Sequence, residues 1–343
     1  MYIPAIIAGL ISFIMTPIVI KIAHRFGAID IPKDERRMHQ KPMPLWGGIA
    51  IFTGFFVSMF IFSNFEKTKL IGLFIASIVV LITGMMDDIK PLGAKSKLVM
   101  QIVAAIILVK SGFEISFFTN FFGDSGLIYL HNFALPISVI WIVGVTNTVN
   151  LIDGLDGLAA GISAIAAVTL SYMALLNSRY DVALMTIILA GSSIGFLPFN
   201  FNPAKIFMGD AGALFLGLVL SAISIEGALK GATAITVVVP ILALGVPIFD
   251  TAFAILRRLV NKRPIMEADK GHLHHRLMSI GLGQKKTVLS MYLISALLGA
   301  GAISLLKQDW IHAGVLLVLA VIVVFIPVNR SLLMQKKNDL DES

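Results

Sequence analysis

Long apolar runs recur along this chain of 343 residues, and no other feature of the sequence restricts the fold as strongly. A helix needs about 20 apolar residues to cross a bilayer, where its backbone polar groups must be satisfied internally. Charged residues make up only 14% of the chain, against roughly 25% in an ordinary soluble domain. We therefore predict an all-α polytopic membrane protein.

The hydropathy pattern predicts about eleven transmembrane helices. They cover residues 2–23, 46–63, 69–86, 97–112, 133–149, 157–176, 182–198, 211–228, 233–256, 287–306 and 310–327. Most of the 27 lysines and arginines fall in alternate loops, on the same side as the C-terminal tail. This bias places the N-terminus outside and the C-terminus in the cytoplasm. We interpret residues 1–330 as one integral membrane domain and residues 331–343 as a cytoplasmic polar tail.

Two segments depart from a simple helical pattern. The ninth span contains Pro240, Gly245 and Pro247, and proline removes a backbone donor, so this helix is predicted to be kinked or broken. Such irregular backbone favours a polar cavity near Asp250. Residues 114–130 are aromatic around a Gly-Asp-Ser-Gly turn, which indicates a small extracytoplasmic β-hairpin at the interface.

Acidic residues gather at the boundary that this topology places in the cytoplasm. Asp87 and Asp88 end the third span, Asp153 and Asp156 follow the fifth, and Asp210 opens the eighth. Paired carboxylates at a helix C-terminus repel each other and the helix dipole, so they call for a cation. Hard divalent cations prefer oxygen ligands. Each acid alone also fits a solvated loop or an N-cap, but three such motifs together favour a site.

Other polar residues lie on the same side. Asn150, Asp153 and Asp156 are spaced three apart, so a helix would place them along one face. A basic loop carries His272, His274 and His275, whose spacing lacks the further ligands of a zinc site. Imidazoles among lysines and arginines donate hydrogen bonds to phosphate oxygens. A merely solvated loop is the alternative interpretation.

Several function classes can be weighed from composition and placement. The absence of cysteine excludes thiol catalysis, and the dispersed charges behind the net +7 indicate no nucleic-acid partner. A transporter is the competing class because an acid such as Asp250 within a span often marks an ion pathway. Acids crowded at one membrane face suit a surface active site better. Carboxylates for a metal and basic donors for phosphates therefore predict phosphoryl or phosphoglycosyl transfer with a lipid participant.

With these motifs the sequence resembles the polyprenyl-phosphate N-acetylhexosamine 1-phosphate transferases. The matching segments, in order, are Gly84 to Asp88, Lys97-Leu98, Asn147 to Gly157, Asn200 to Gly212, Pro247 to Asp250, and His272 to His275. The motif His-Leu-His-His followed by Arg-Leu is similar to the WecA and TagO branch rather than to MraY relatives. Leu45 and Trp46 depart from the family, which often has an arginine before the Gly-Gly of this loop.

The resemblance implies transfer of GlcNAc 1-phosphate from UDP-GlcNAc to undecaprenyl phosphate, with release of UMP. It implies Mg²⁺, with Mn²⁺ as an alternative, and a multi-pass protein of the bacterial cytoplasmic membrane whose active site faces the cytoplasm. The lipid-linked sugar would start a cell-surface glycan of the teichoic acid or O-antigen type. An MraY-like transfer of phospho-MurNAc-pentapeptide is the alternative within the family. The oligomeric state is left open, a homodimer included.

The resemblance also implies roles for individual residues. Asp210 matches a Mg²⁺ ligand, while Asp87 and Asp88 match the acidic pair beside the metal, one of them a base for the lipid phosphate. Lys97 matches a lysine that contacts the diphosphate. The remaining substrate-binding matches are Asn150, Asp153 and Asp156 on the nucleotide side, Asn200, and the histidines His272, His274 and His275 near the sugar phosphate.

Overall fold

Helices make up nearly all of the protein. The structure is a computed structural model that describes residues 2–32, 41–119, 127–227, 235–262 and 271–341. Its α-helices are α1 (Tyr2–Phe26), α2 (Gly48–Phe62), α3 (Lys67–Ile89), α4 (Ala94–Lys110), α5 (Ala134–Ile152), α6 (Leu158–Leu176), α7 (Tyr180–Asn200), α8 (Gly209–Gly227), α9 (Ile235–Ala243), α10 (Gly245–Val260), α11 (Leu273–Ser279), α12 (Gln284–Leu306) and α13 (Trp310–Asp341). A 3₁₀ turn, η1 (His131–Phe133), precedes α5.

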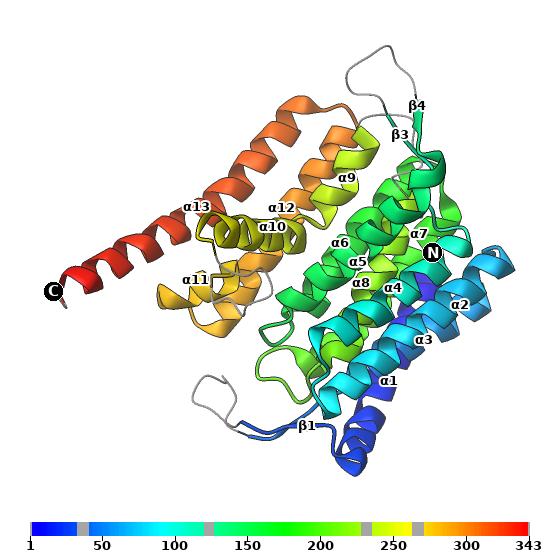
Figure 1. The fold of residues 1–343 in the computed structure, drawn as a ribbon, viewed down its shortest axis with the longest axis horizontal. Helices are drawn as coiled ribbons and strands as arrows, with labels where there is room; N and C mark the ends of the chain where they lie inside the picture. Colours follow the sequence, from blue (N-terminus) through cyan, green and yellow to red (C-terminus); the bar gives the residue numbers. More distant parts are fainter. Residues whose placement is uncertain (1, 33–40, 120–126, 228–234, 263–270, 342–343) are drawn as a thin grey trace.

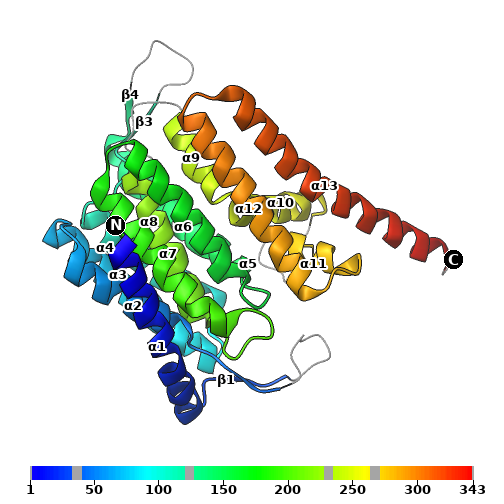
Figure 2. The same cartoon turned by 180° about the vertical axis from the view of Figure 1, so that it is seen from behind.

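The helices form two groups that pack side by side. Helices α1 to α8 make one bundle, and α9 to α13 lie along its flank (Figures 1 and 2). Contacts of α12 and α9 with α6 join the groups, and α10 also packs on α5. Helix α8 is the centre of the larger bundle because every residue from Ala211 to Glu226 is buried. Its glycine, alanine and serine residues let α3 and α5 approach closely, as is usual where membrane helices pack.

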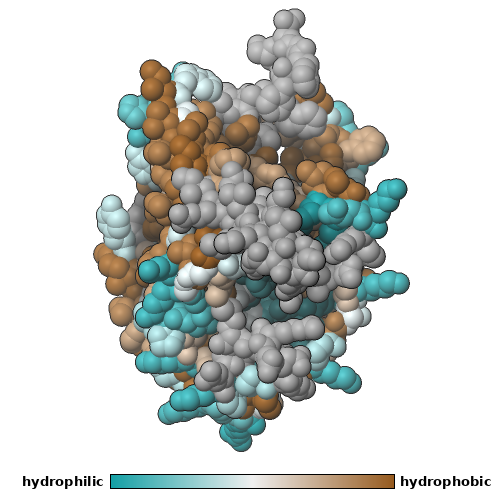
Figure 3. Space-filling view, turned by 90° about the vertical axis from the view of Figure 1, so that its left-hand side faces the viewer, coloured by the Kyte–Doolittle hydropathy of each residue, from teal (hydrophilic) through white to brown (hydrophobic). Residues whose placement is uncertain are grey.

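The surface of the bundle is that of a membrane protein. Seven helices of the described chain are long and apolar enough to cross a bilayer: α1, α3, α5 with η1, α6, α7, α8 and α12. Large apolar side chains such as Ile6, Ile14 and Val321 are well exposed. Hydrophobic residues dominate the upper part of the face in Figure 3, and hydrophilic residues gather toward its lower end. The chain is therefore polytopic, while the count of eleven crossings stays a prediction.

The ninth predicted span is broken, as expected from its prolines. Helix α9 ends at Ala243 and α10 begins at Gly245, with a turn at Leu244 between them. Pro247 lies in the first turn of α10, where a missing N–H costs no intrahelical bond. Helix α10 consequently runs across the neighbouring helices instead of continuing α9 (Figure 1). This change of direction brings Asp250 toward α11.

Two short antiparallel pairs connect the helices. Strands β3 (Phe117–Thr119) and β4 (Leu127–Tyr129) confirm the predicted hairpin, although its Gly-Asp-Ser-Gly turn lies outside the described residues. Strands β1 (Ile29–Asp30) and β2 (Met43–Pro44) form a pair that the sequence did not predict. The predicted polar tail continues α13 as helix to Asp341.

Candidate active site

The end of α3 and the beginning of α8 meet through bare backbone. A Cβ atom at Gly84 would lie 2.3 Å from the main-chain nitrogen of Ala211, and one at Gly209 would lie 2.4 Å from Asp88 Oδ2. Gly209 also has a φ of 72°, a conformation that glycine adopts without strain. These glycines let the two helices approach until the acids at their ends converge.

Asp88 is joined to the main chain of α8. Its Oδ1 accepts a hydrogen bond from the backbone N–H of Asp210 at 2.9 Å. Its Oδ2 is buried and has no hydrogen-bond partner in the part of the chain that is described. A buried carboxylate oxygen is normally satisfied, so this atom calls for a proton or a cation.

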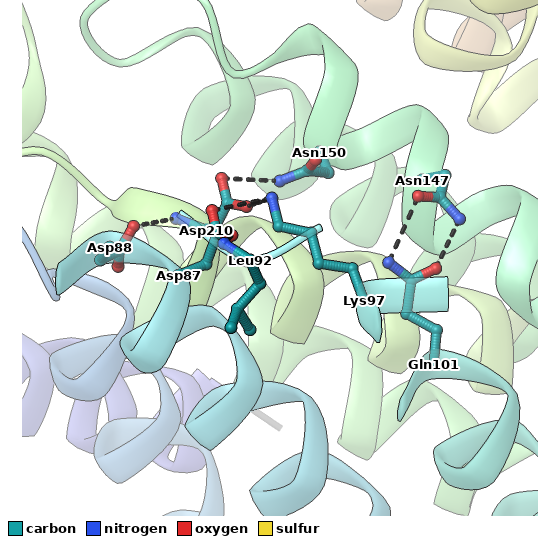
Figure 4. A network of polar contacts seen from close by, with 8 residues as sticks. All are labelled: Asp87, Asp88, Leu92, Lys97, Gln101, Asn147, Asn150 and Asp210. Carbon is teal, nitrogen blue, oxygen red and sulfur yellow. Dashed lines mark hydrogen bonds and ion pairs between the residues drawn. The ribbon is translucent and has the colours of Figure 1, made fainter. Parts of the chain in front are cut away.

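Lys97 lies between the other two acids. Its Nζ atom is 2.8 Å from Asp87 Oδ2 and 2.5 Å from Asp210 Oδ2 (Figure 4). Asp87 Oδ1 accepts from the backbone N–H of Leu92, and Asp210 Oδ1 accepts from Asn150 Nδ2 at 3.1 Å. The ammonium group therefore holds the position of a cation between two carboxylates. Four residues predicted from separate motifs share one network.

The carboxylates fit a magnesium ion in the kind and number of their oxygens. Among the residues described, no three histidine or acidic side chains are grouped to hold a metal. Mg²⁺, however, usually takes only one or two carboxylates and completes its octahedron with water and substrate phosphates. Asp87 and Asp210 supply such a pair, which Lys97 neutralises in this structure. The same donor set suits Mn²⁺.

The loop between α5 and α6 holds the next two predicted acids. Asp153 follows α5 directly, and burial, together with repulsion from Asp210 and Asp156, raises its pKa to about 8. Asp156 is used within the protein: its Oδ2 accepts from Asn202 Nδ2 at 2.9 Å and from the N–H of Ala204 at 3.2 Å. Asp156 is thus engaged with the segment that precedes α8, whereas Asp153 takes up a proton more readily than an exposed carboxyl group.

Asn200 is buried and ties two segments together. Its Oδ1 accepts from the N–H of Gly157 at 3.1 Å, and its Nδ2 donates to the carbonyl of Ile206 at 3.0 Å. Both ends of this amide are therefore engaged with main chain. In this structure Asn200 shapes the loop before α8, and the substrate contact implied for it stays a prediction.

The histidine segment docks on the α5–α6 loop. His272 Nδ1 lies 2.8 Å from Asp250 Oδ2, and Asp250 Oδ1 accepts from the N–H of Leu273 at 2.8 Å. His274 is buried against Gly154, where an added Cβ would meet its Nε2 at 2.7 Å. Its ring centroid is 4.2 Å from that of His275. The two motifs, more than 100 residues apart in the sequence, form one wall of the site.

His274 is held in its neutral form. Burial lowers its pKa to about 4, and repulsion from His275 and His272 adds to the effect despite the opposing charge of Asp250. Its Nδ1 is buried and makes no hydrogen bond with any described residue. A neutral imidazole with one nitrogen free is able to take a hydrogen bond from, or give one to, a ligand.

Three positioning residues were missed by sequence reasoning. Asp250, which sequence reasoning placed in a matching motif and near a cavity or ion pathway without a role in the site, anchors the histidine segment. Tyr292 on α12 donates its hydroxyl to the carbonyl of Gly157 at 2.5 Å, and Gln101 pairs with Asn147 beside Lys97. For Asp250, the sequence signal was an acidic residue close to Pro247 within an apolar span. A lone tyrosine or glutamine in an apolar helix gave none.

The unusual first loop packs under the site. Trp46 replaces the arginine expected from the resemblance, is buried, and donates its indole N–H to the carbonyl of Met85 at 3.2 Å. The backbone N–H groups of Gly47 and Gly48 donate to the carbonyls of Phe207 and Met208, each at 3.0 Å. The loop thus supports the segment before Asp210 through its main chain.

Comparisons with known proteins find relatives that match most of the chain. Residues 70–228 match the family described as "Glycosyl transferase family 4". The chain is 41% identical to a Bacillus subtilis protein named "Probable undecaprenyl-phosphate N-acetylglucosaminyl 1-phosphate transferase", over 92% of this chain and 88% of that one. It is 33% identical to the "Decaprenyl-phosphate N-acetylglucosaminephosphotransferase" of Mycolicibacterium smegmatis, over 94% and 87% of the two chains.

A second type of relative matches nearly as much of the chain. The "Phospho-N-acetylmuramoyl-pentapeptide-transferase" of Prochlorococcus marinus is 32% identical over 84% of this chain and 85% of its own. The matches at higher identity carry N-acetylglucosamine in their names.

Proposed function

This chain belongs to the polyprenyl-phosphate N-acetylhexosamine 1-phosphate transferases of glycosyl transferase family 4, and we propose that it transfers GlcNAc 1-phosphate from UDP-GlcNAc to undecaprenyl phosphate. A lipid phosphate oxygen bonds to the phosphorus that carries the sugar. The bond from that phosphorus to the bridging oxygen breaks, and UMP leaves with the electron pair. The names of relatives with 41% and 33% identity support this donor over the MurNAc-pentapeptide donor.

The observation that carries the mechanism is the position of Lys97 between Asp87 and Asp210. We assign these two carboxylates to a divalent cation, Mg²⁺ or Mn²⁺, which would supply charge neutralisation on the diphosphate. With a cation held by these two carboxylates, the Lys97 ammonium would be free to contact a phosphate oxygen of the donor. Asn150 keeps the Asp210 carboxylate oriented through its hydrogen bond to Oδ1.

Asp88 is our candidate for the base that takes a residual proton from the lipid phosphate. Asp87 is already bonded to Lys97 and to the N–H of Leu92, whereas Asp88 Oδ2 has no partner within the described chain. A phosphate is largely ionised near neutral pH, so this step needs little driving force. Asp88 Oδ1 also accepts a hydrogen bond from the backbone N–H of Asp210 in the first turn of α8. The two oxygens thus differ in role, since Oδ1 binds the helix and Oδ2 would take the proton.

We assign the nucleotide side of the donor to Asp153 and the loop around it. His274 lies against this loop and His275 packs on His274, and together with His272 they would contact the sugar phosphate. His274, neutral and with a free Nδ1, suits a hydrogen bond to an uncharged hydroxyl or amide as well as to phosphate.

We further propose that the protein lies in the bacterial cytoplasmic membrane with eleven crossings, the carboxylate site facing the cytoplasm. The distribution of lysine and arginine over alternate loops supports this orientation. Lys97 begins α4, whereas the β3–β4 hairpin follows the end of the same helix. In the proposed topology, the site and the hairpin lie on opposite faces of the membrane.

The test uses the purified full-length protein in detergent. It is incubated with undecaprenyl phosphate and UDP-GlcNAc, with and without Mg²⁺, and UMP release is measured. Release that requires both the lipid and the cation is expected. UMP release with UDP-MurNAc-pentapeptide but not with UDP-GlcNAc would show that the former is the donor. No release with either donor would contradict the proposal.

A further inference from the structure

A polar pocket lies at the ends of α3 and α8 that are far from the carboxylates Asp88 and Asp210. It has a volume of about 480 Å³ and opens where α3 and α7 begin and α8 ends. Asp88 and Asp210 lie at the opposite ends of α3 and α8. A helix of 23 residues such as α3 is about 34 Å long, slightly more than the hydrocarbon core of a bilayer. In the proposed topology, the pocket lies in the headgroup layer opposite to that of the carboxylates.

A buried acid links two cations in this pocket. Glu226 is 4% exposed, and its Oε1 lies 3.0 Å from Lys69 Nζ. Arg179 Nη2 donates to the backbone carbonyl of Glu226 at 2.8 Å and lies 3.5 Å from its Oε2. These contacts use only part of the three donors of an ammonium group and the five of a guanidinium group. Lys69 and Arg179 retain N–H groups for an anionic ligand.

Two further acids in the pocket lining have unused acceptors. Glu66 precedes α3 and Asp181 lies in the first turn of α7, both exposed. Neither side chain has a hydrogen bond or an ion pair with another described residue. The lining thus contains two cations and three carboxylates, a net negative set with free groups of both signs.

We propose that this pocket binds the headgroup of a zwitterionic phospholipid that carries a primary amine. Its phosphate would accept hydrogen bonds from Lys69 and Arg179, and its ammonium would donate to Glu66 and Asp181. The aromatic rings of Phe65 and Tyr180 complete the lining, as aromatic side chains commonly do at the membrane interface.

Other ligand classes fit this pocket less well. A purely anionic headgroup would add negative charge to a lining that already has an excess of carboxylates. The volume lies within the roughly 300–1,000 Å³ range of small-molecule sites, ample for a headgroup.

The test measures lipid binding to the full-length protein in detergent by native mass spectrometry. Short-chain phosphatidylethanolamine, phosphatidylcholine and phosphatidylglycerol are compared, and the first is expected to bind most tightly. The double variant Glu66→Gln, Asp181→Asn should weaken phosphatidylethanolamine binding roughly fivefold, the combined effect of two exposed ion pairs. These acids are chosen because changing Lys69 or Arg179 would leave the buried Glu226 charge unpaired.

Asp309→Asn is the matched control, since Asp309 is exposed near the same membrane face but outside the pocket. It should leave lipid binding unchanged, and both variants should keep UMP release. Equal binding of the three lipids, or an unaffected double variant, would overturn the proposal. Full competition by soluble glycerophosphoethanolamine at equal concentration would also overturn it, because the occupant would then be a soluble zwitterion.

Discussion

The side-chain amides of Gln101 and Asn147 hydrogen-bond to each other in both directions (Figure 4). Asn147 Nδ2 donates to Gln101 Oε1 at 2.5 Å, and Gln101 Nε2 donates to Asn147 Oδ1 at 3.3 Å. Gln101 lies one turn after Lys97 on α4, and Asn147 lies one turn before Asn150 on α5. The pair therefore sets the relative position of two helices, whose residues Lys97 and Asn150, one turn away, both contact Asp210.

Loss of either amide should lower turnover through position rather than through charge. We expect Gln101→Leu and Asn147→Leu each to reduce kcat about tenfold, because the remaining amide is left without its partner at a cost of about 1–3 kcal/mol. The double variant should be little worse than either single one. Additive losses in this double-mutant cycle would show that the two amides act independently.

Asp210→Asn should abolish cation-dependent turnover. The change removes a charge that faces Lys97 and is assigned to Mg²⁺, so UMP release should fall by at least about 100-fold. The variant keeps the size of the side chain, and circular dichroism should report the same helix content. Wild-type rates would remove Asp210 from the site.

Gly154→Ala should disturb the histidine wall. The new Cβ would meet His274 Nε2 at 2.7 Å, so the ring has to move. We expect the KM for UDP-GlcNAc to rise several-fold with a smaller change in kcat. Gly283→Ala is the control, because a Cβ at Gly283 has no atom within 4 Å. Equal kinetics of the two variants would argue against the contact.

His274→Ala should weaken use of the nucleotide sugar without affecting membrane insertion. The buried ring is assigned to the sugar phosphate, and its removal leaves a gap beside the α5–α6 loop. A raised KM for UDP-GlcNAc with normal yield in the membrane fraction is expected. Unaltered kinetics would favour a histidine segment with only a structural role.

Acid should destabilise the protein in part through His274. Its pKa is about 4 in the folded protein against 6.5 when exposed, so the unfolded chain binds the proton more readily between these values. The stability due to the neutral ring is fully present above pH 6.5 and is lost as the pH falls toward 4, an effect of about 3 kcal/mol. Thermal unfolding in detergent should depend less on pH in His274→Phe than in the wild type. Parallel curves would contradict the neutral ring.

Hydropathy was sufficient to predict most of the fold, because each helix that must lie in lipid has to be apolar over its length. The break near Leu244 followed equally from Pro240 and Pro247. The pair β1–β2 was missed, since two residues on each side of a loop leave no periodic pattern. The extension of α13 beyond the predicted span was also missed, because its end is polar.

The site was predictable in its residue types but not in its contacts. Motif order indicated that Asp87, Asn150 and Asp210 share one face of the membrane. It gave no sign that Lys97 would bridge two of the acids, because that depends on how α4 packs beside α5. The pairing of Asp250 with His272 depends on the direction of α10 across the bundle. That direction is set by tertiary packing, which the local sequence does not reveal. Asn200 is a different case. It belongs to a matching motif, but both ends of its side-chain amide form hydrogen bonds with the main chain.

The contact of α3 with α8 leaves peptide groups, rather than side chains, directly beneath the carboxylates. Mutation acts on side chains, so this floor offers little room for gradual change: a side chain at Gly84 would collide with main-chain atoms of Ala211 and Asp210, and one at Gly209 would collide with the Asp88 carboxylate. A new sugar preference would therefore have to arise in the walls, at the α5–α6 loop and the histidine segment. The proposed chemistry thus depends on the α3–α8 contact, where few substitutions fit. The choice of sugar depends on the α5–α6 loop and the histidine segment, where more substitutions fit.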